Sequence, residues 1–307
     1  MSRITIVLHN GLNNRNLPLA SVLRLAKKSN RKVNIIWTYT PVRSCLEYKG
    51  DLCKFNEIYK SIDGVTIDDY SEKKDQKIYE FKYWDNLDHV IDISGNNDIF
   101  INFALYPIIS LDDRSDIVIN TQNTLKNKNY IELDDLCYEI GDIMNNVLKP
   151  VDELQNEIDN YVKKFKKNML GLHIRTTDGD FVNFNWKEII NKLIIESEKW
   201  LKKDSINNGL FLATDDLNVY IQLLCHFGNS LIFYNPPETL CNSKSSTKFN
   251  NDKYNVFVGL IELYLLSKCN SYIIGTSKST FSFCAMLMAA KETKKYLINS
   301  IDTIPTL

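Results

Sequence analysis

Short apolar runs alternate with longer amphipathic stretches throughout the C-terminal half of the chain. The runs are typical of buried strands, and the stretches repeat their apolar residues with helical spacing. The predicted strands are residues 169–174, 210–213, 231–233, 272–274 and 296–298, and the predicted helices are residues 187–201, 217–227, 254–268 and 280–290. Repeated β-α units of this size imply a parallel sheet with helices on both faces. In such folds ligands bind at the carboxyl ends of the strands.

The first forty residues also read as a β-α-β unit. Residues 4–9 and 33–37 are predicted strands, and residues 17–28 are a predicted helix. Between the first strand and this helix, the sequence Gly11-Leu12-Asn13-Asn14-Arg15 is typical of a tight turn. The middle of the chain is less regular, and its predicted strands are residues 65–67, 78–83, 90–93, 99–103 and 117–119.

Two further helices are predicted on either side of Pro150, at residues 134–148 and 151–167. The second carries acidic residues early and lysines late, which suits the helix dipole. We place the domain boundary at its end, so that residues 1–165 form one α/β domain and residues 166–307 a second, Rossmann-like domain. A chain of 307 residues has room for two domains, each with its own core.

Composition and charge restrict the class of partner. The chain is 44% hydrophobic and 24% charged, and its 37 basic residues nearly balance its 38 acidic ones. A nucleic-acid binder that neutralises many phosphates normally has a clear basic excess, so we expect no nucleic-acid partner. The balance still allows a small anionic ligand, because one well-placed arginine can bind a phosphate in a neutral protein.

The same sequence predicts a cytoplasmic protein. No apolar run approaches the roughly 20 residues that span a bilayer, and the N-terminus lacks the apolar core of a signal peptide. The seven cysteines are scattered without a CxxC motif, so free thiols in a reducing compartment are the simplest interpretation. A Cys45–Cys53 disulfide in a secreted protein is the alternative.

The first candidate motif is His173-Ile174-Arg175-Thr176-Thr177-Asp178, at the end of a predicted strand. His173 and Arg175 alternate with apolar residues, so their side chains point to the same face of the sheet. Arg175 could donate a fork of N–H bonds to a diphosphate and stabilise the charge that develops as a sugar leaves it. Alternatively, His173 is a satisfied core residue and Arg175 pairs with Asp178.

A second predicted strand runs into Ala213-Thr214-Asp215-Asp216. Paired aspartates raise the idea of a metal site, but a DxD arrangement that would present two carboxylates to a cation is absent there. We therefore prefer the interpretation that Asp215 or Asp216 caps the helix that follows. No metal is expected.

The third motif joins an acidic helix to a hydroxyl-rich loop, Gly275-Thr276-Ser277-Lys278-Ser279-Thr280-Phe281. Such a loop at a helix N-terminus offers hydroxyl and backbone N–H donors to an anion, although helix capping by Ser279 explains part of it. Glu262 lies in an otherwise apolar helix, where a carboxylate requires a partner. A guanine base would supply one, as would a protein lysine or arginine.

The fourth motif is the N-terminal turn, where Asn13 and Asn14 tolerate left-handed backbone conformations and present side-chain amides. Turns of glycine and asparagine are common, so this motif alone carries little functional information.

Taken together, the four motifs resemble the fucosyltransferase superfamily that includes the α1,6-fucosyltransferases, the rhizobial nodulation fucosyltransferases and the protein O-fucosyltransferases. The family has a Gly-x-Gly-Asn-type turn, a His-x-Arg-Arg-Thr-Asp-like segment, an Ala-Thr-Asp strand end, and an acidic helix followed by a Ser-rich loop. All four motifs occur here in that order and span nearly the whole chain.

The resemblance implies a GT-B-like α/β fold of two Rossmann-like domains with a ligand cleft between them. It implies an acceptor-side N-terminal domain, GDP-fucose as donor, a glycan or polypeptide acceptor, and inversion without a metal or other cofactor. By the same resemblance, His173 and Arg175 match residues that contact the donor phosphates, and Asn14 matches an amide near the sugar and phosphate. Ser279, Thr280 and Phe281 match the nucleotide-binding loop, and Glu262 stands where an Asp reads guanine.

The sequence also departs from the family pattern. Thr176 replaces the second Arg of the Arg-Arg pair, and Asn13 replaces the Gly before the Asn. The Glu that follows the motif in the α1,6 branch is absent, so Asp180 or Asp178 is the candidate general base. Two alternatives to a fucosyltransferase remain: the same fold with another donor, as in a rhamnosyltransferase, and a non-catalytic relative that binds a nucleotide or glycan.

Overall fold

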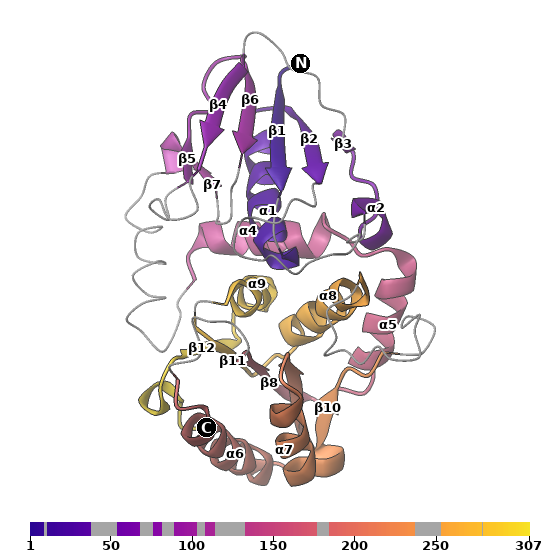
Figure 1. The fold of residues 1–307 in the computed structure, drawn as a ribbon, viewed down its shortest axis with the longest axis vertical. Coiled ribbons are helices and arrows are strands. Elements are labelled where there is room, and N and C mark those ends of the chain that lie inside the picture. The colour runs from indigo at the N-terminus through magenta and orange to yellow at the C-terminus, as the bar shows by residue number, and fades with distance from the viewer. Residues whose placement is uncertain are drawn as a thin grey trace. The chain divides into compact units, whose positions relative to one another are not determined.

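The computed structural model describes residues 1–8, 11–37, 54–67, 76–81, 89–102, 108–113, 133–176, 184–236, 253–277 and 279–307. The chain divides into two compact units (Figure 1). Of the described residues, the first unit contains those up to residue 113 together with 134–151, and the second contains 152–307. Two separate parallel sheets, each with its own helices, confirm the predicted α/β class.

The first unit is built on a five-stranded parallel sheet of order β3-β2-β1-β6-β4. Its strands are β1 (Arg3–Leu8), β2 (Lys32–Trp37), β3 (Val65–Ile67), β4 (Gln76–Glu80) and β6 (Asp98–Asn102). The short strands β5 (His89–Ile91) and β7 (Ile108–Ser110) pair separately. The helices are α1 (Leu12–Lys28), α2 (Phe55–Ile58), α4 (Asp135–Asn146) and the 3₁₀ turn η1 (Leu111–Asp113).

The predicted turn at residues 11–15 is wrong, because α1 already begins at Leu12. Gly11 has an extended backbone at the N-cap, and the first helical turn follows it directly. Among the described residues outside glycine, Asn30 has a positive φ, so the left-handed conformations considered for Asn13 and Asn14 do not occur. Polar side chains near the start of α1, Asn13, Arg15 and Asn16, are buried. Asn16, for example, accepts a hydrogen bond from the Tyr59 hydroxyl at 2.8 Å.

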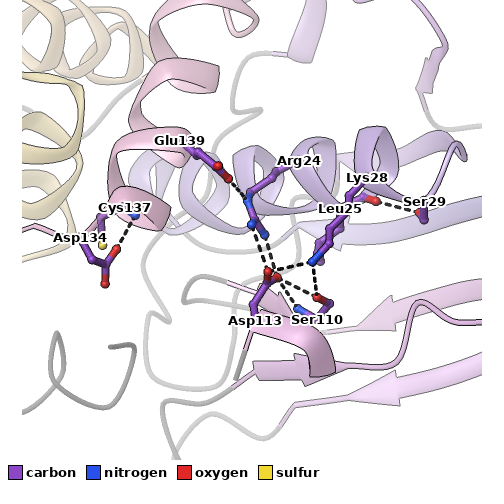
Figure 2. A network of polar contacts seen from close by, with 9 residues as sticks. All are labelled: Arg24, Leu25, Lys28, Ser29, Ser110, Asp113, Asp134, Cys137 and Glu139. Atoms are coloured by element: carbon purple, nitrogen blue, oxygen red, sulfur yellow. Dashed lines mark hydrogen bonds and ion pairs between the residues drawn. The ribbon is translucent and has the colours of Figure 1, made fainter. Parts of the chain in front are cut away.

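A charge network connects the other end of α1 to its neighbours (Figure 2). Arg24 donates two hydrogen bonds to the Asp113 carboxylate, at 2.8 and 3.1 Å, and a third to Glu139 of α4 at 2.5 Å. Lys28 and both donors of Ser110 also reach Asp113. Burial alone would raise the pKa of Asp113, but these donors hold that pKa well below its ordinary value.

The second unit has a five-stranded parallel sheet of order β10-β9-β8-β11-β12. The strands are β8 (Asn168–Ile174), β9 (Asn208–Thr214), β10 (Leu231–Phe233), β11 (Tyr272–Thr276) and β12 (Lys294–Ile298). The helices are α5 (Asp152–Val162), α6 (Trp186–Lys203), α7 (Leu217–Phe227), α8 (Lys253–Ser267) and α9 (Thr280–Met288), with 3₁₀ turns η3 (Gly228–Ser230) and η4 (Ile301–Thr303). Helices α6 and α7 lie on one face of the sheet, and α8 and α9 on the other (Figure 1).

Helix α5 belongs to the second unit, where it packs against α8 and buries Leu154 and Ile158. Its last turn also contacts the end of β10, since the Tyr161 ring lies 4.9 Å from that of Tyr234. The compact units therefore divide at 151/152, whereas the sequence placed the domain boundary at 165/166. The role of each domain in binding donor or acceptor stays a prediction.

Other sequence expectations have simple outcomes. The cysteines among the described residues, Cys137, Cys225, Cys269 and Cys284, are free thiols, and the Cys45–Cys53 pair lies outside the described residues. None of the helices in the described ranges combines the length and apolar character needed to cross a bilayer. The predicted strand at 117–119 also falls outside those ranges, and β7 was not predicted.

Candidate functional site

The candidate site lies at the carboxyl ends of β8 and β11, in the second unit. From β8 the chain crosses one face of the sheet through α6 to β9, whereas from β11 it crosses the opposite face through α9 to β12. The two neighbouring strands therefore send their following segments to opposite sides. Ligands bind at such switch points in open parallel sheets, because the diverging segments leave room at the strand ends.

Two threonine hydroxyls hold the end of β8 from both sides. Thr276, on β11, donates from Oγ1 to the carbonyl of His173 at 3.1 Å and accepts the N–H of Arg175 at 2.9 Å. Thr214, on β9, donates from Oγ1 to the carbonyl of Ile174 at 2.7 Å. These bonds replace the strand ladder where it ends, so the backbone that carries Arg175 is fixed at a defined position.

Among the described residues, Arg175 is a cation at this edge of the sheet. Its side chain is 35% exposed, and its Nε lies 3.8 Å from Oδ2 of Asp215, which is exposed to the same extent. A contact of this length between half-exposed groups is a weak ion pair. The alternative pairing with Asp178 concerns a residue outside the described ranges. Asp215 is a described carboxylate beside Arg175, and the side chain is partly exposed although its Nε is buried.

Asp215 and Asp216 hold the backbone in place through hydrogen bonds to residues near them. Asp216 occupies the N-cap of α7 and accepts the N–H of Asn218 at 2.8 Å, which confirms the capping interpretation for this residue. Thr176 donates its hydroxyl to Asp216 at 2.6 Å, and its N–H reaches Asp215 at 3.2 Å. Thr176, which stands at the family's second Arg, therefore ties the segment after β8 to the segment after β9.

His173 lies beneath Arg175 on the same face of the sheet and is almost completely buried. Its ring stacks on Phe281 of α9, with 4.5 Å between centroids, and its Nδ1 lies 2.7 Å from Oγ of Ser282. Burial, with a smaller effect of the Arg175 charge, lowers the pKa of His173 to about 3. The imidazole is therefore neutral at physiological pH.

The approach of Ser282 depends on Gly275. A Cβ at residue 275 would lie 2.5 Å from the Ser282 Oγ, which is too close for any side chain. Because residue 275 is glycine, α9 can pack against β11 closely enough for Ser282 to donate to the Thr276 carbonyl at 3.0 Å.

The N-terminus of α9 adds hydrogen-bond donors to the site. Ser279 is at the N-cap with an extended backbone, but its side chain makes no capping bond, so the capping expected for it is not seen. Its hydroxyl is buried and has no hydrogen-bond partner among the described residues. A buried hydroxyl beside the first N–H groups of a helix suits a bound anion. Thr280 and Phe281 form the first turn of α9, and both are partly exposed.

Glu262 is buried on α8 with 6% of its surface exposed. One turn later, Leu266 packs against Gly171 of β8, where a Cβ would lie only 2.6 Å from the leucine. Helix α8 leads into β11, which is parallel to β8, so α8 runs in the opposite direction to β8. Glu262 is therefore nearer than Leu266 to the carboxyl edge of the sheet.

The remaining predicted site residues belong to the first unit or fall outside the described ranges. Asn13 and Asn14 are in the first turn of α1 in the first unit, where Asn13 is buried. Asp178 and Asp180 fall outside the described residues. Within the described part of the chain, no group of three or more His, Cys, Asp or Glu side chains could hold a metal ion.

Sequence reasoning missed the hydroxyl groups that organise this site, namely Thr214, Thr276 and Ser282. Thr214 and Thr276 come one and two residues after the predicted strands 210–213 and 272–274, but which strands become neighbours of the one that carries His173 was not predicted. Hydroxyl side chains at the ends of adjacent strands are positioned to bond the carbonyls of the strand between them.

No protein-family model and no curated protein matches the chain. Solved structures do match. The chain is similar to fucosyltransferase NodZ from Bradyrhizobium, with a TM-score of 0.54 and 15% identity over 94% of each chain. It is similar to a variant of Arabidopsis thaliana FUT1 in complex with GDP, with a TM-score of 0.54 and 12% identity, over 96% of this chain and 70% of that one.

It is also similar to POFUT1 in complex with GDP-fucose, with a TM-score of 0.52 and 10% identity, over 97% of this chain and 98% of that one. At these identities the likeness shows the fold. The chain has the GT-B-type α/β fold of these proteins, as the sequence predicted.

Proposed function

We propose that the chain is a glycosyltransferase that transfers fucose from GDP-fucose to a hydroxyl group of a glycan or polypeptide, with inversion and without a metal ion. The fold supports this proposal, because the solved proteins that share it are fucosyltransferases, including one in complex with GDP-fucose. The geometry also supports it, because His173, Arg175 and the loop at Ser279 lie at the same edge of the second sheet.

The observation that carries the proposal is the position of the Arg175 guanidinium. Arg175 follows β8 at a switch point of the sheet, on a backbone braced by two hydroxyls, and about a third of its side chain is exposed. When the bond between the sugar and the diphosphate breaks, negative charge develops on the β-phosphate. A guanidinium held in place before the reaction stabilises this charge without reorganising.

The other candidate residues take roles around Arg175. The Ser279 hydroxyl and the first N–H groups of α9 donate to the diphosphate, with Thr280 and Phe281 completing the loop. Glu262 accepts the N1–H and N2–H donors of guanine. Asn13 and Asn14 of the first unit contact the donor substrate, and this unit binds the acceptor. Asp180 or Asp178 takes the proton of the acceptor hydroxyl as general base.

The proposal is tested with a thermal-shift and turnover panel of GDP-, UDP- and dTDP-sugars, with and without EDTA. We expect stabilisation by GDP and GDP-fucose that EDTA does not change, and release of GDP in the presence of a suitable hydroxyl acceptor. Preference for UDP or dTDP would overturn the guanine assignment and favour a rhamnosyltransferase-like donor. Binding of GDP-fucose without hydrolysis or transfer would favour a non-catalytic relative, and a requirement for a divalent cation would contradict the metal-free mechanism.

The guanine role of Glu262 has a sharper test. GDP has a 2-amino group that IDP lacks, and a carboxylate can accept a hydrogen bond from this group. We expect the native chain to bind GDP about tenfold more tightly than IDP, the scale of one hydrogen bond to a charged group. In Glu262→Leu, which removes both acceptor oxygens, this preference should largely disappear. An unchanged preference in the variant means that another residue reads the base.

A further inference from the structure

The protonation state of His173 follows from counting protons in its hydrogen-bond chain. Ser282 has one hydroxyl proton, and the Thr276 carbonyl, 3.0 Å away, can only accept it. With its proton donated to that carbonyl, the Ser282 Oγ is left as acceptor toward His173 Nδ1 at 2.7 Å, which assigns the imidazole proton to Nδ1. A neutral imidazole has one ring proton, which leaves Nε2 with an unshared electron pair.

This tautomer limits what His173 can bind. An unprotonated Nε2 accepts hydrogen bonds and donates none, so it does not stabilise a phosphate oxygen, which is itself an acceptor. Protonation to an imidazolium would remove the restriction, but the ring is buried and stands beside the Arg175 charge. A ligand atom that contacts Nε2 must therefore be a hydroxyl or N–H donor.

The position of His173 indicates which donor group it meets. On the face of the sheet covered by α8 and α9, Arg175 lies at the diphosphate end, and Glu262 on α8 is the proposed base reader. His173 comes two residues before Arg175 on the same strand and faces these helices through its stack on Phe281. Between the base and the diphosphate of a nucleotide, the hydroxyl donors are those of the ribose.

We infer that Ser282 is a positioning residue that holds His173 as the neutral Nδ1–H tautomer, and that His173 Nε2 accepts a hydrogen bond from a ribose hydroxyl of the nucleotide. The inference rests on the proposed function for the identity of the ligand, and it replaces the phosphate contact that the family resemblance implies for His173. It makes the nucleotide site selective for ribonucleotides over deoxyribonucleotides.

The tautomer is measured on the ligand-free protein, independently of any activity. In a ¹⁵N-histidine-labelled chain, protonated and unprotonated ring nitrogens resonate in separate ranges. The chain has four histidines, and the His173 signals are assigned by their loss in His173→Asn. We expect a protonated Nδ1 and an unprotonated Nε2 at neutral pH. An Nε2–H tautomer or an imidazolium would overturn the inference.

The role of Ser282 is separated from a merely structural one by a matched serine. Ser282→Ala removes the acceptor of the Nδ1 proton, so the histidine signals should shift toward a mixture of tautomers and GDP affinity should fall. Ser267, on α8, is also buried, and its hydroxyl bonds its own helix at the Tyr264 carbonyl. Ser267→Ala should leave the His173 signals unchanged. Unchanged signals in a folded Ser282→Ala would contradict the positioning role.

The ribose contact is tested by a cycle between protein and ligand. His173→Asn keeps an N–H donor toward Ser282 but removes the Nε2 acceptor. The affinities of GDP, 2′-deoxy-GDP and 3′-deoxy-GDP are measured by calorimetry for the native chain and for this variant. We expect loss of one of the two hydroxyls to weaken native binding about five- to tenfold, and to have little further effect in the variant.

Additive losses for both hydroxyls would contradict the ribose contact while leaving GDP as the ligand. A native chain that binds no GDP would instead contradict the proposed function, and the ribose assignment would fall with it. The nitrogen signals of His173 would still decide the tautomer in that case, so the two failures are distinguishable.

Discussion

Arg24 in the first unit and Arg175 in the second both meet carboxylates, but the two environments differ. Arg24 is 14% exposed and bonds two carboxylates at 2.8 and 2.5 Å, in a network that joins α1, η1 and α4 (Figure 2). Arg175 is 35% exposed, and its ion pair with Asp215 is 3.8 Å long. Charge neutralised inside the protein stabilises the fold, whereas charge held on a fixed backbone and open to solvent is able to bind a ligand.

The hydroxyl groups around Arg175 show the same difference. Thr214 and Thr276 brace its backbone with neutral hydrogen bonds and leave the charge of its side chain unchanged. In the first unit, Ser110 donates to the same carboxylate that receives Arg24 and therefore belongs to the ion network itself. The predictions below test whether function and stability separate between these two arginines.

The largest expected effect is on turnover in Arg175→Ala. Removing a preorganised donor to the developing phosphate charge should lower kcat by about 10²- to 10³-fold. The melting temperature should change little, because the ion pair with Asp215 is long and exposed. Arg24→Ala is the matched control, for which we expect a lower melting temperature and nearly native turnover per folded molecule. The comparison fails if Arg175→Ala unfolds the protein or if it turns over at the native rate.

The next effect is on stability, in Asp113→Asn. Asn keeps one acceptor oxygen but loses the negative charge that Arg24 and Lys28 share, and we expect about 2 kcal/mol of destabilisation in urea unfolding. Because the folded pKa of Asp113 is depressed, its contribution is fully present above the unfolded carboxyl pKa of about 4 and is lost as pH falls from there through the lower folded pKa. The difference in the free energy of unfolding between the native chain and Asp113→Asn should therefore become smaller in acid. Asp92→Asn, which breaks the exposed pair with Lys77, should change stability much less.

A smaller effect on turnover is expected for Asp215→Asn. The Asp215 carboxylate orients the Arg175 side chain, so its loss should lower kcat about tenfold by misplacing the guanidinium. Asp216→Asn is the neighbouring control. Because Asn is as good an N-cap as Asp, this variant keeps the cap of α7 and should change both stability and turnover little. Equal effects of the two variants on kcat would show that Asp215 does not position Arg175.

The smallest effect concerns Lys295, a buried lysine on β12 that donates to the carbonyls of Ala290 and Thr293. Burial lowers its pKa from 10.5 to about 8. Between these values the unfolded chain binds more protons than the folded chain, so this group makes stability rise with pH across that window. Unfolding of native protein and Lys295→Met at neutral and alkaline pH should show a steeper rise for the native chain. Parallel pH profiles would contradict this.

Sequence reasoning predicted the second unit more accurately than the first. Buried strands read as continuous apolar runs, so residues 169–174 and 231–233 were placed within a residue of β8 and β10. The helical spacing of apolar residues likewise placed residues 217–227 at α7. The first unit has shorter and more polar strands. In β4, Ile78 is 62% exposed, so its apolar character did not mark a buried position. The first turn of α1 was mistaken for a loop because its glycine and asparagines are typical turn residues, whereas the helix begins directly after Gly11.

The site was predictable only in part for a similar reason. The period of two along a strand was enough to place His173 and Arg175 on one face. The hydroxyl groups that bond this strand could not be found in this way, because Thr276 is 101 residues from Arg175 and Ser282 is 109 residues from His173 along the chain. Their roles depend on which strands become neighbours, and strand order is not encoded in any local pattern.

The central claim is that Arg175 binds the donor diphosphate, and a crystal structure of the chain with bound GDP tests it most directly. We predict the diphosphate at the ends of β8 and β11, with its oxygens within hydrogen-bond distance of the Arg175 guanidinium and the Ser279 hydroxyl. GDP bound elsewhere on the protein, or a diphosphate at this edge with Arg175 turned away and closed on Asp215, would contradict it.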